Sequence, residues 1–247
     1  MKLDLTVIIS CRDEWQIIRE VVYDIGNIFF QNNIPGNVIV VDDNSTPPLT
    51  LEDIELPHCI KITRLYKNVF DPGLAEALKT GITYAHSKYV IFMSGDETDD
   101  PEAIPLFYKH LERGYDCVLG QRDWTTDAGL SYPLIKWVLN RLGNRLISLF
   151  FERRYSDYTD MFKGYRLSTT CLGLSCQAKG FAFPLELCLR AILSGASHRV
   201  IRVSSGSRIF GRSKFQLWRE MPEYLITFWN CLKLKYGKKG REKWQKT

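Results

Sequence analysis

Short apolar runs alternate with helix-like segments through the first half of the chain. Five runs are rich in β-branched and aromatic side chains, which suits buried strands. They span residues 5–9, 38–41, 60–65, 89–93 and 116–119. Because strands that alternate with helices are joined by crossover connections, they lie parallel in one sheet. We therefore predict an α/β fold with a mostly parallel, Rossmann-like sheet and helices on both of its faces.

Two of the predicted strands end in acidic residues. The second strand is followed by Asp42 and Asp43, and the fourth by Asp96, which Glu97 and Asp99 follow. The carboxyl ends of parallel strands meet at one edge of a sheet, where open α/β sheets bind ligands. Carboxylates at such an edge suit Mg²⁺ or Mn²⁺. For either cluster alone, a turn that caps the next helix is the alternative.

Composition and length exclude several classes of protein. The 247 residues, 45% hydrophobic and 25% charged, are typical of a globular chain with one or two domains. No run of 18 uncharged apolar residues occurs, so no transmembrane helix is expected, and the first residues do not resemble a signal peptide. Seven cysteines without a CxxC pair indicate reduced, buried thiols rather than zinc ligands. A net charge of +5 does not indicate nucleic-acid binding, and neither GxGxxG nor a Walker loop is present.

A series of motifs occurs in a characteristic order. They are SCRDE at 10–14, VDDNS at 41–45, SGD at 94–96, GYDCVLGQR at 114–122, DYTDMFKGYR at 157–166, FPLEL at 183–187 and RIFGRSK at 208–214. In this order they resemble family 2 glycosyltransferases of the GT-A fold. Within that family the chain is similar to the dolichol- and polyprenyl-phosphate sugar transferases. The resemblance covers residues 5–234.

The resemblance implies a nucleotide-sugar-dependent glycosyltransferase of the hexosyltransferase type, acting with inversion. The implied acceptor is a polyprenyl phosphate of the dolichyl or undecaprenyl type, or another glycan or lipid, and the implied cofactor is Mg²⁺ or Mn²⁺. Ser94 replaces the first acid of the family's DxD triplet. Two other functions therefore stay open: a non-catalytic module that binds nucleotide or lipid phosphate, and a nucleotidyltransferase. The second normally needs a glycine-rich basic loop, which residues 10–14 lack.

The candidate site residues fall into four overlapping groups. Those expected to bind the nucleotide-sugar are Ser10, Arg12, Glu14, Asp42, Asp43 and Asp96. Those expected to bind the metal are Asp96 and Glu97, with Asp99 as a substitute. Those expected to bind the acceptor or its phosphate are Arg122, Lys136, Asp157, Asp160, Arg208, Ser213 and Lys214. The catalytic candidates are Asp96, Arg122 and Arg208, because a departing diphosphate needs positive charge and a lipid phosphate needs no strong base.

Two later segments combine apolar and basic residues at helical spacing. They are residues 130–151 and 215–235, and basic residues continue to the end of the chain. We expect residues 1–214 to form the GT-A domain and residues 215–247 to form an amphipathic helix with a basic tail. Such a helix can lie in a membrane interface, so the predicted location is cytoplasmic and peripheral on the cytoplasmic face of a membrane. Packing onto the domain, or onto the partner in a homodimer, is the alternative.

Overall fold

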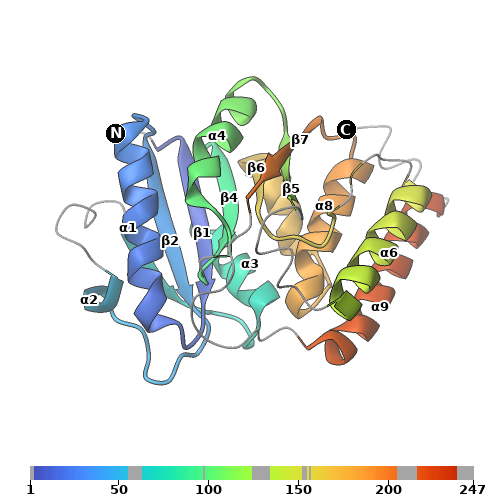
Figure 1. The fold of residues 1–247 in the computed structure, drawn as a ribbon, viewed down its shortest axis with the longest axis horizontal. Helices are drawn as coiled ribbons and strands as arrows, with labels where there is room; N and C mark the ends of the chain where they lie inside the picture. Colours follow the sequence, from blue (N-terminus) through green and yellow to red (C-terminus); the bar gives the residue numbers. More distant parts are fainter. Residues whose placement is uncertain are drawn as a thin grey trace.

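A seven-stranded sheet forms the centre of the molecule. The computed structural model describes residues 3–54, 63–96, 98–123, 134–151, 155, 157–204 and 216–237 (Figure 1). The strands follow the spatial order β3-β2-β1-β4-β6-β5-β7. Their bounds are Leu5–Cys11 (β1), Gly36–Asp42 (β2), Thr63–Lys67 (β3), Tyr89–Ser94 (β4), Cys117–Arg122 (β5), Lys163–Arg166 (β6) and His198–Val203 (β7).

Six of these strands point the same way, and β6 runs against them. β1 pairs in parallel with β2 and β4, β2 with β3, and β5 with β7. β6 is antiparallel to both β4 and β5. The predicted mostly parallel α/β sheet is therefore confirmed. The five predicted strands correspond to β1–β5, although β3 begins at Thr63 and residues 60–62 lie outside the described residues.

Helices cover both faces of the sheet. Their bounds are Trp15–Gln31 (α1), Leu51–Ile54 (α2), Leu74–Tyr84 (α3), Ile104–Glu112 (α4), Leu134–Phe151 (α6), Leu167–Thr170 (α7), Phe183–Leu193 (α8) and Leu217–Tyr236 (α9). Side chains alternate across each strand. Val7 and Ile9 of β1 therefore pack with α1 and α4, whereas Ile8 packs on the face covered by α3 and α8. This arrangement confirms helices on both faces of the sheet.

The last helix is tied to the body of the protein. α9 packs against α8 and α6 at one end of the molecule (Figure 1). The hydroxyl of Tyr224 donates to the carbonyl of Phe181 at 2.7 Å, and a Glu223 carboxylate oxygen accepts from the backbone N–H of Lys179 at 2.9 Å. Of the described helices, none is both long and apolar enough to cross a membrane.

Candidate active site

The carboxyl ends of β1, β2 and β3 meet in a hydrogen-bonded group centred on Asp43. One oxygen of the buried Asp43 carboxylate accepts from the Asn68 side-chain amide at 2.9 Å and from the Gly73 N–H at 2.8 Å. The other oxygen lies 3.9 Å from a guanidinium nitrogen of Arg12. Arg12 is half exposed, so this group presents a guanidinium to the strand-end edge. Asp43 holds the start of α3 and the end of β3 together.

Asp42 shapes its own loop. Its two carboxylate oxygens accept from the backbone N–H groups of Ser45, at 3.0 Å, and Leu49, at 3.2 Å. The loop after β1 is tied to this loop, because Asp13 accepts from the Thr46 N–H at 2.8 Å. The Asp13 N–H in turn donates to the Ser45 hydroxyl at 2.9 Å. The two adjacent acids at the end of β2 thus have different partners.

A tight turn at the end of β4 orients Asp96. One Asp96 oxygen accepts from the Ser94 hydroxyl, from the Thr98 hydroxyl at 2.6 Å and from the Thr98 N–H at 3.2 Å. A side chain at Gly95 would place its Cβ 3.1 Å from the Cγ2 of Ile9, so glycine lets the turn lie close to β1. Asp96 is buried, with 6% of its surface exposed.

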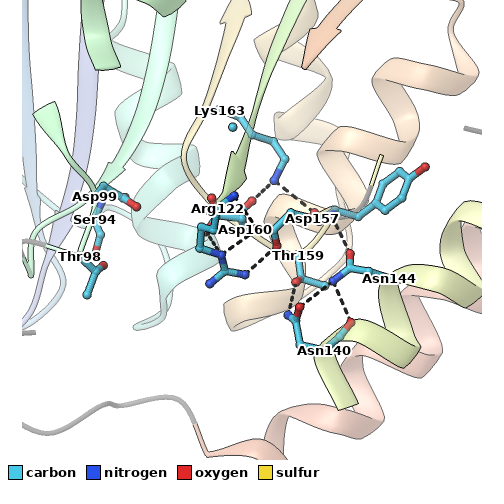
Figure 2. Close-up of polar contacts among 12 residues, drawn as sticks. Ser94, Thr98, Asp99, Arg122, Asn140, Asn144, Asp157, Thr159, Asp160 and Lys163 are labelled. Atoms are coloured by element: carbon cyan, nitrogen blue, oxygen red, sulfur yellow. Dashed lines mark hydrogen bonds and ion pairs between the residues drawn. The ribbon is translucent and has the colours of Figure 1, made fainter. Parts of the chain in front are cut away.

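Asp99 also stabilises this turn, through the backbone of Ser94. Its carboxylate accepts from the Ser94 N–H at 2.7 Å, and the side chain lies beside Ser94 at the end of β4 (Figure 2). The pKa of Asp99 is raised to about 7, mainly by burial and also by the nearby Asp160 carboxylate, while the hydrogen bond from the Ser94 N–H opposes the shift. The carboxylate predicted as a substitute metal ligand is therefore engaged with the β4 backbone.

Arg122, the last residue of β5, forms a two-point ion pair with Asp157. Its Nε and Nη2 donate to the two Asp157 oxygens at 2.8 and 2.7 Å (Figure 2). Asp160 lies 3.5 Å from the same Nε. Burial raises the pKa of Asp160, and the Arg122 charge opposes this shift. Within the described part of the chain, the Asp160 Oδ2 atom is buried without a hydrogen-bond partner.

The turn that carries these two acids is held from two sides. The fully buried Lys163 of β6 donates to the backbone carbonyls of Tyr158 and Asp160. From α6, Asn144 accepts from the Tyr158 N–H at 2.7 Å, and Asn140 donates to the Thr159 hydroxyl at 3.1 Å (Figure 2). These contacts fix the backbone of the turn opposite Arg122.

The sequence did not single out several of these supporting residues. Asn140 and Asn144 are four residues apart and therefore share one face of α6, which is a signal that sequence reasoning could have used. Asn68, which is one of the residues that carry the resemblance to family 2 glycosyltransferases, follows β3 at the same edge as the predicted acids. Lys163 belongs to the motif at 157–166, but its burial was not expected, because lysine is rarely buried.

The structure brings most of the predicted site residues to one edge. Because β6 is antiparallel to both β4 and β5, the carboxyl end of β5 lies at the same edge as that of β4. Ser10 of β1 lies between Val41 of β2 and Ser94 of β4, and Glu14 directly precedes α1. The edge thus carries nine of the candidates: Ser10, Arg12, Glu14, Asp42, Asp43, Asp96, Arg122, Asp157 and Asp160.

The remaining candidates lie outside the described residues. They are Glu97, Arg208, Ser213, Lys214 and the side chain of Lys136. Among the side chains that are described, no three acidic, histidine or cysteine residues form a group that could hold a metal ion. Any metal at Asp96 therefore needs further ligands.

The fold is that of GT-A glycosyltransferases, as solved structures demonstrate. Glucosyl-3-phosphoglycerate synthase from Mycobacterium tuberculosis, in complex with Mn²⁺, uridine diphosphate and phosphoglyceric acid, superposes with a TM-score of 0.69 at 15% identity, covering 93% of this chain and 78% of that one. The chain belongs to glycosyl transferase family 2, whose model matches residues 6–171. This confirms the predicted family and the predicted enzyme class, a nucleotide-sugar glycosyltransferase.

Two curated relatives are similar over most of the chain. An uncharacterized glycosyltransferase from Mycobacterium bovis is 27% identical over 214 residues, which is 85% of this chain and 88% of the relative. The undecaprenyl-phosphate 4-deoxy-4-formamido-L-arabinose transferase of Erwinia tasmaniensis is 24% identical over 216 residues, covering 86% of this chain and 63% of the relative. The second relative is named for undecaprenyl phosphate, a polyprenyl phosphate, which is the class of acceptor predicted for this chain.

Proposed function

We propose that this glycosyltransferase transfers a sugar, with inversion, from a nucleotide-diphosphate sugar to a polyprenyl phosphate. One structural observation carries the proposal. The oriented Asp96 lies at the same sheet edge as the Arg12–Asp43 group and the Arg122 cluster. A donor and an acceptor bound on either side of Asp96 would meet there. The relative that acts with undecaprenyl phosphate supports the choice of acceptor.

In this proposal the donor occupies the edge formed by β1, β2 and β3. Arg12 and Asp43 offer a cation and a carboxylate within 3.9 Å of each other, suited to the polar edge of a base and to ribose hydroxyls. Ser10 and Glu14 would contact the donor from the end of β1. Asp42 would contribute by holding the loop after β2 in place.

The residues around Asp96 fit a divalent cation that is held mainly by its substrate. Asp96 and the hydroxyl of Ser94 supply hard oxygen ligands, and Mg²⁺ commonly binds through one or two carboxylates plus phosphate oxygens. Glu97 is a further candidate ligand. When bound, Mg²⁺ or Mn²⁺ would neutralise charge on the departing diphosphate. Asp96 would keep its carboxylate fixed through the Ser94 and Thr98 hydroxyls.

The acceptor would bind on the β5 side of Asp96. Its phosphate oxygen is already anionic at neutral pH, so the chain need only position it for attack on the sugar carbon. Arg122, Arg208, Ser213 and Lys214 are the proposed phosphate-binding residues, and Lys136 a further one. Asp157 would act by fixing the direction of the Arg122 guanidinium, which it binds at two points.

A hydroxyl acceptor is the second candidate, and one observation favours it. The Asp160 Oδ2 atom is buried without a hydrogen-bond partner in the described part of the chain, and the pKa of this carboxyl is raised. A carboxylate with such a pKa suits a general base that takes a proton from an attacking hydroxyl. Phosphate acceptors need no such base, so the two candidates differ in their need for Asp160.

A product assay with the purified full chain tests both candidates. It would combine a panel of nucleotide-sugars with Mn²⁺ and either a polyprenyl phosphate or the matching polyprenol. Sugar transfer to the phosphate, and not to the alcohol, is the expected result. Transfer only to hydroxyl acceptors, lost in Asp160→Asn, would replace the proposal with the second candidate. Nucleotide binding without transfer to either acceptor would support a non-catalytic binding module.

The proposed acceptor also implies a place of action. A polyprenyl chain is anchored in a bilayer, so its phosphate lies at the membrane surface. The protein would therefore work peripherally at the membrane surface, with residues 215–247 as its membrane-associating segment.

A further inference from the structure

The two helices at the end of the molecule expose apolar side chains. α6 and α9 pack against each other, and α9 also packs against α8 (Figure 1). Each helix buries one face, with Ile147 and Phe151 on α6 and Thr227 and Cys231 on α9. On an ordinary surface helix the opposite face is polar. Here the opposite face of both helices is largely apolar.

On α6 the outward face is a row of aliphatic side chains. Its exposed members are Ile135, Val138, Leu142, Leu146 and Leu149. Because they recur every three or four residues, they lie along one side of the helix. Leu149 is 71% exposed and Ile135 is 67% exposed. None of these side chains is covered by the part of the chain that the structure describes.

On α9 the outward face is aromatic and aliphatic. Trp218, Leu225, Trp229 and Tyr236 are exposed, Trp218 by as much as 76%. Their spacings of seven, four and seven residues place them in a single stripe along the helix. Tryptophan and tyrosine favour the boundary between water and a bilayer, since their rings are apolar and their polar atoms stay hydrated.

The charges beside these stripes are basic. α6 contains Lys136, Arg141 and Arg145 and no acidic residue. On α9, Arg219 and Lys233 are exposed, and the Lys233 ammonium lies 6.0 Å from the Trp229 ring centre. The sequence beyond α9 adds five more basic residues and one acid: Lys238, Lys239, Arg241, Lys243, Lys246 and Glu242.

The two acids of α9 face the protein instead. Glu223 accepts from the Lys179 N–H, and a Glu220 oxygen would lie 3.2 Å from a Cβ built on Gly180. The outward side of the two-helix surface therefore joins apolar stripes with positive charge.

We infer that this two-helix surface, formed by the outward faces of α6 and α9, docks the protein onto an anionic lipid bilayer. The apolar stripes would enter the interfacial layer while the arginine and lysine residues contact lipid phosphates. This inference rests on the proposed function in one respect, because a lipid acceptor requires the chain to reach a membrane. The exposed side chains of α6 and α9 do not depend on which acceptor the protein uses.

A second copy of this chain fits the surface less well. A two-fold dimer brings identical patches together, so the basic residues of one copy would face those of the other. An anionic membrane supplies opposite charge to the same residues. Charge complementarity thus favours lipid over self-association.

Docking would also position the candidate acceptor site. The same helix that exposes Leu142 and Leu146 uses Asn140 and Asn144 to hold the turn of residues 157–160. A bilayer bound to α6 would therefore lie one helix thickness from that turn, about 10 Å. A phosphate at the bilayer surface could reach the site without leaving its lipid.

Vesicle flotation with the full chain tests the inference without measuring turnover. The vesicles would be phosphatidylcholine alone or phosphatidylcholine mixed with phosphatidylglycerol. We expect binding to the mixed vesicles with a blue shift of tryptophan fluorescence. Leu142→Glu combined with Leu146→Glu, and separately Trp229→Glu, should each weaken binding about tenfold or more, since each removes apolar burial and adds a repelled charge.

Phe30→Glu is the matched control. Phe30 is 86% exposed on α1, at the other end of the molecule (Figure 1), and its replacement should leave vesicle binding unchanged. Circular dichroism melting would verify that each variant folds. Binding that survives both helix variants would overturn the inference.

Self-association is the other result that would overturn it. This would be seen as a dimer in light scattering that Leu142→Glu dissociates, with no binding to vesicles. If vesicles bind as expected but no polyprenyl phosphate is glycosylated, the proposed acceptor fails while the docking surface stands.

Discussion

Arg122 and Asp157 are joined at three points. The guanidinium donates twice to the carboxylate, at 2.8 and 2.7 Å, and the Arg122 backbone N–H donates to the same group at 3.2 Å. Asp157 is fully buried and Arg122 is mostly buried. The pair therefore links the end of β5 to the turn before β6.

Removing one partner of this pair should cost stability. Asp157→Ala leaves a largely buried guanidinium without its two-point carboxylate partner, so we expect a loss of about 3 kcal/mol in the free energy of unfolding. Urea denaturation measures it. A double-mutant cycle with Arg122→Ala should recover much of that loss, because the charge left unpaired is then absent. If the stability losses of the two single variants simply add in the double variant, Arg122 and Asp157 are not directly coupled.

Asp96 is expected to matter most for turnover. Asp96→Asn keeps the shape of the side chain but removes its charge, so kcat should fall roughly a hundredfold or more. Asp100→Asn is the matched control, because asparagine can also accept the hydrogen bond that Asp100 receives from the Glu102 N–H at 3.0 Å. Equal activity in both variants would contradict the role of Asp96.

The metal requirement can be tested at Ser94. If a divalent cation binds beside Asp96, then Ser94→Asp restores the first acid of the triplet and adds a ligand. The Mn²⁺ concentration that gives half-maximal activity should then decrease. EDTA should abolish activity in both proteins, and added Mn²⁺ should restore it. Full activity in EDTA would show that transfer proceeds without a metal.

The two adjacent acids at the end of β2, Asp42 and Asp43, should behave differently. Asp42→Ala removes the acceptor of two backbone N–H groups, so we expect a stability loss of about 1 to 3 kcal/mol with little change in donor affinity. Asp43→Ala removes the carboxylate that Asn68 and Arg12 contact, so it should raise KM for the nucleotide-sugar. Kinetics and thermal melting, measured on both variants, separate the effects. Equal effects on KM would contradict the assignment.

Asp99 should make stability depend on pH. Its pKa is raised from the ordinary value of 3.8 to about 7, so between these two pH values the folded state keeps a proton that the unfolded state loses. The resulting stabilisation is complete below about pH 4 and is lost as the pH rises through about 7. Asp99→Asn cannot titrate, so its stability relative to the native chain should increase over that range. Parallel pH profiles of the two proteins would contradict this.

Sequence reasoning found the part of the fold that obeys simple periodicity. Strands such as β2 and β4 are continuous apolar runs buried on both faces, which is the pattern expected of central parallel strands. β6 has four residues and begins with Lys163, and β7 includes Arg199 and Arg202. Neither strand has an apolar run, so neither was predicted.

The part of the candidate site at the strand ends was predictable from position. The rule that ligands bind at the carboxyl ends of strands led to Asp43, Asp96 and Arg122. It could not say that Asp42 is bound by its own loop or that Asp99 accepts from Ser94. These roles depend on the path of the backbone after each strand, which residue identity alone does not determine.

The antiparallel strand β6 lies between β4 and β5, and the edge on its two sides is built by separate stretches of the chain. The described residues between the end of β5 and the start of β6 include α6, Asp157 and Asp160. The donor side is built by β1 to β4, which precede that stretch in the chain. Under the proposed arrangement, exchange of this single stretch of coding sequence would alter part of the acceptor side while leaving the donor side unchanged.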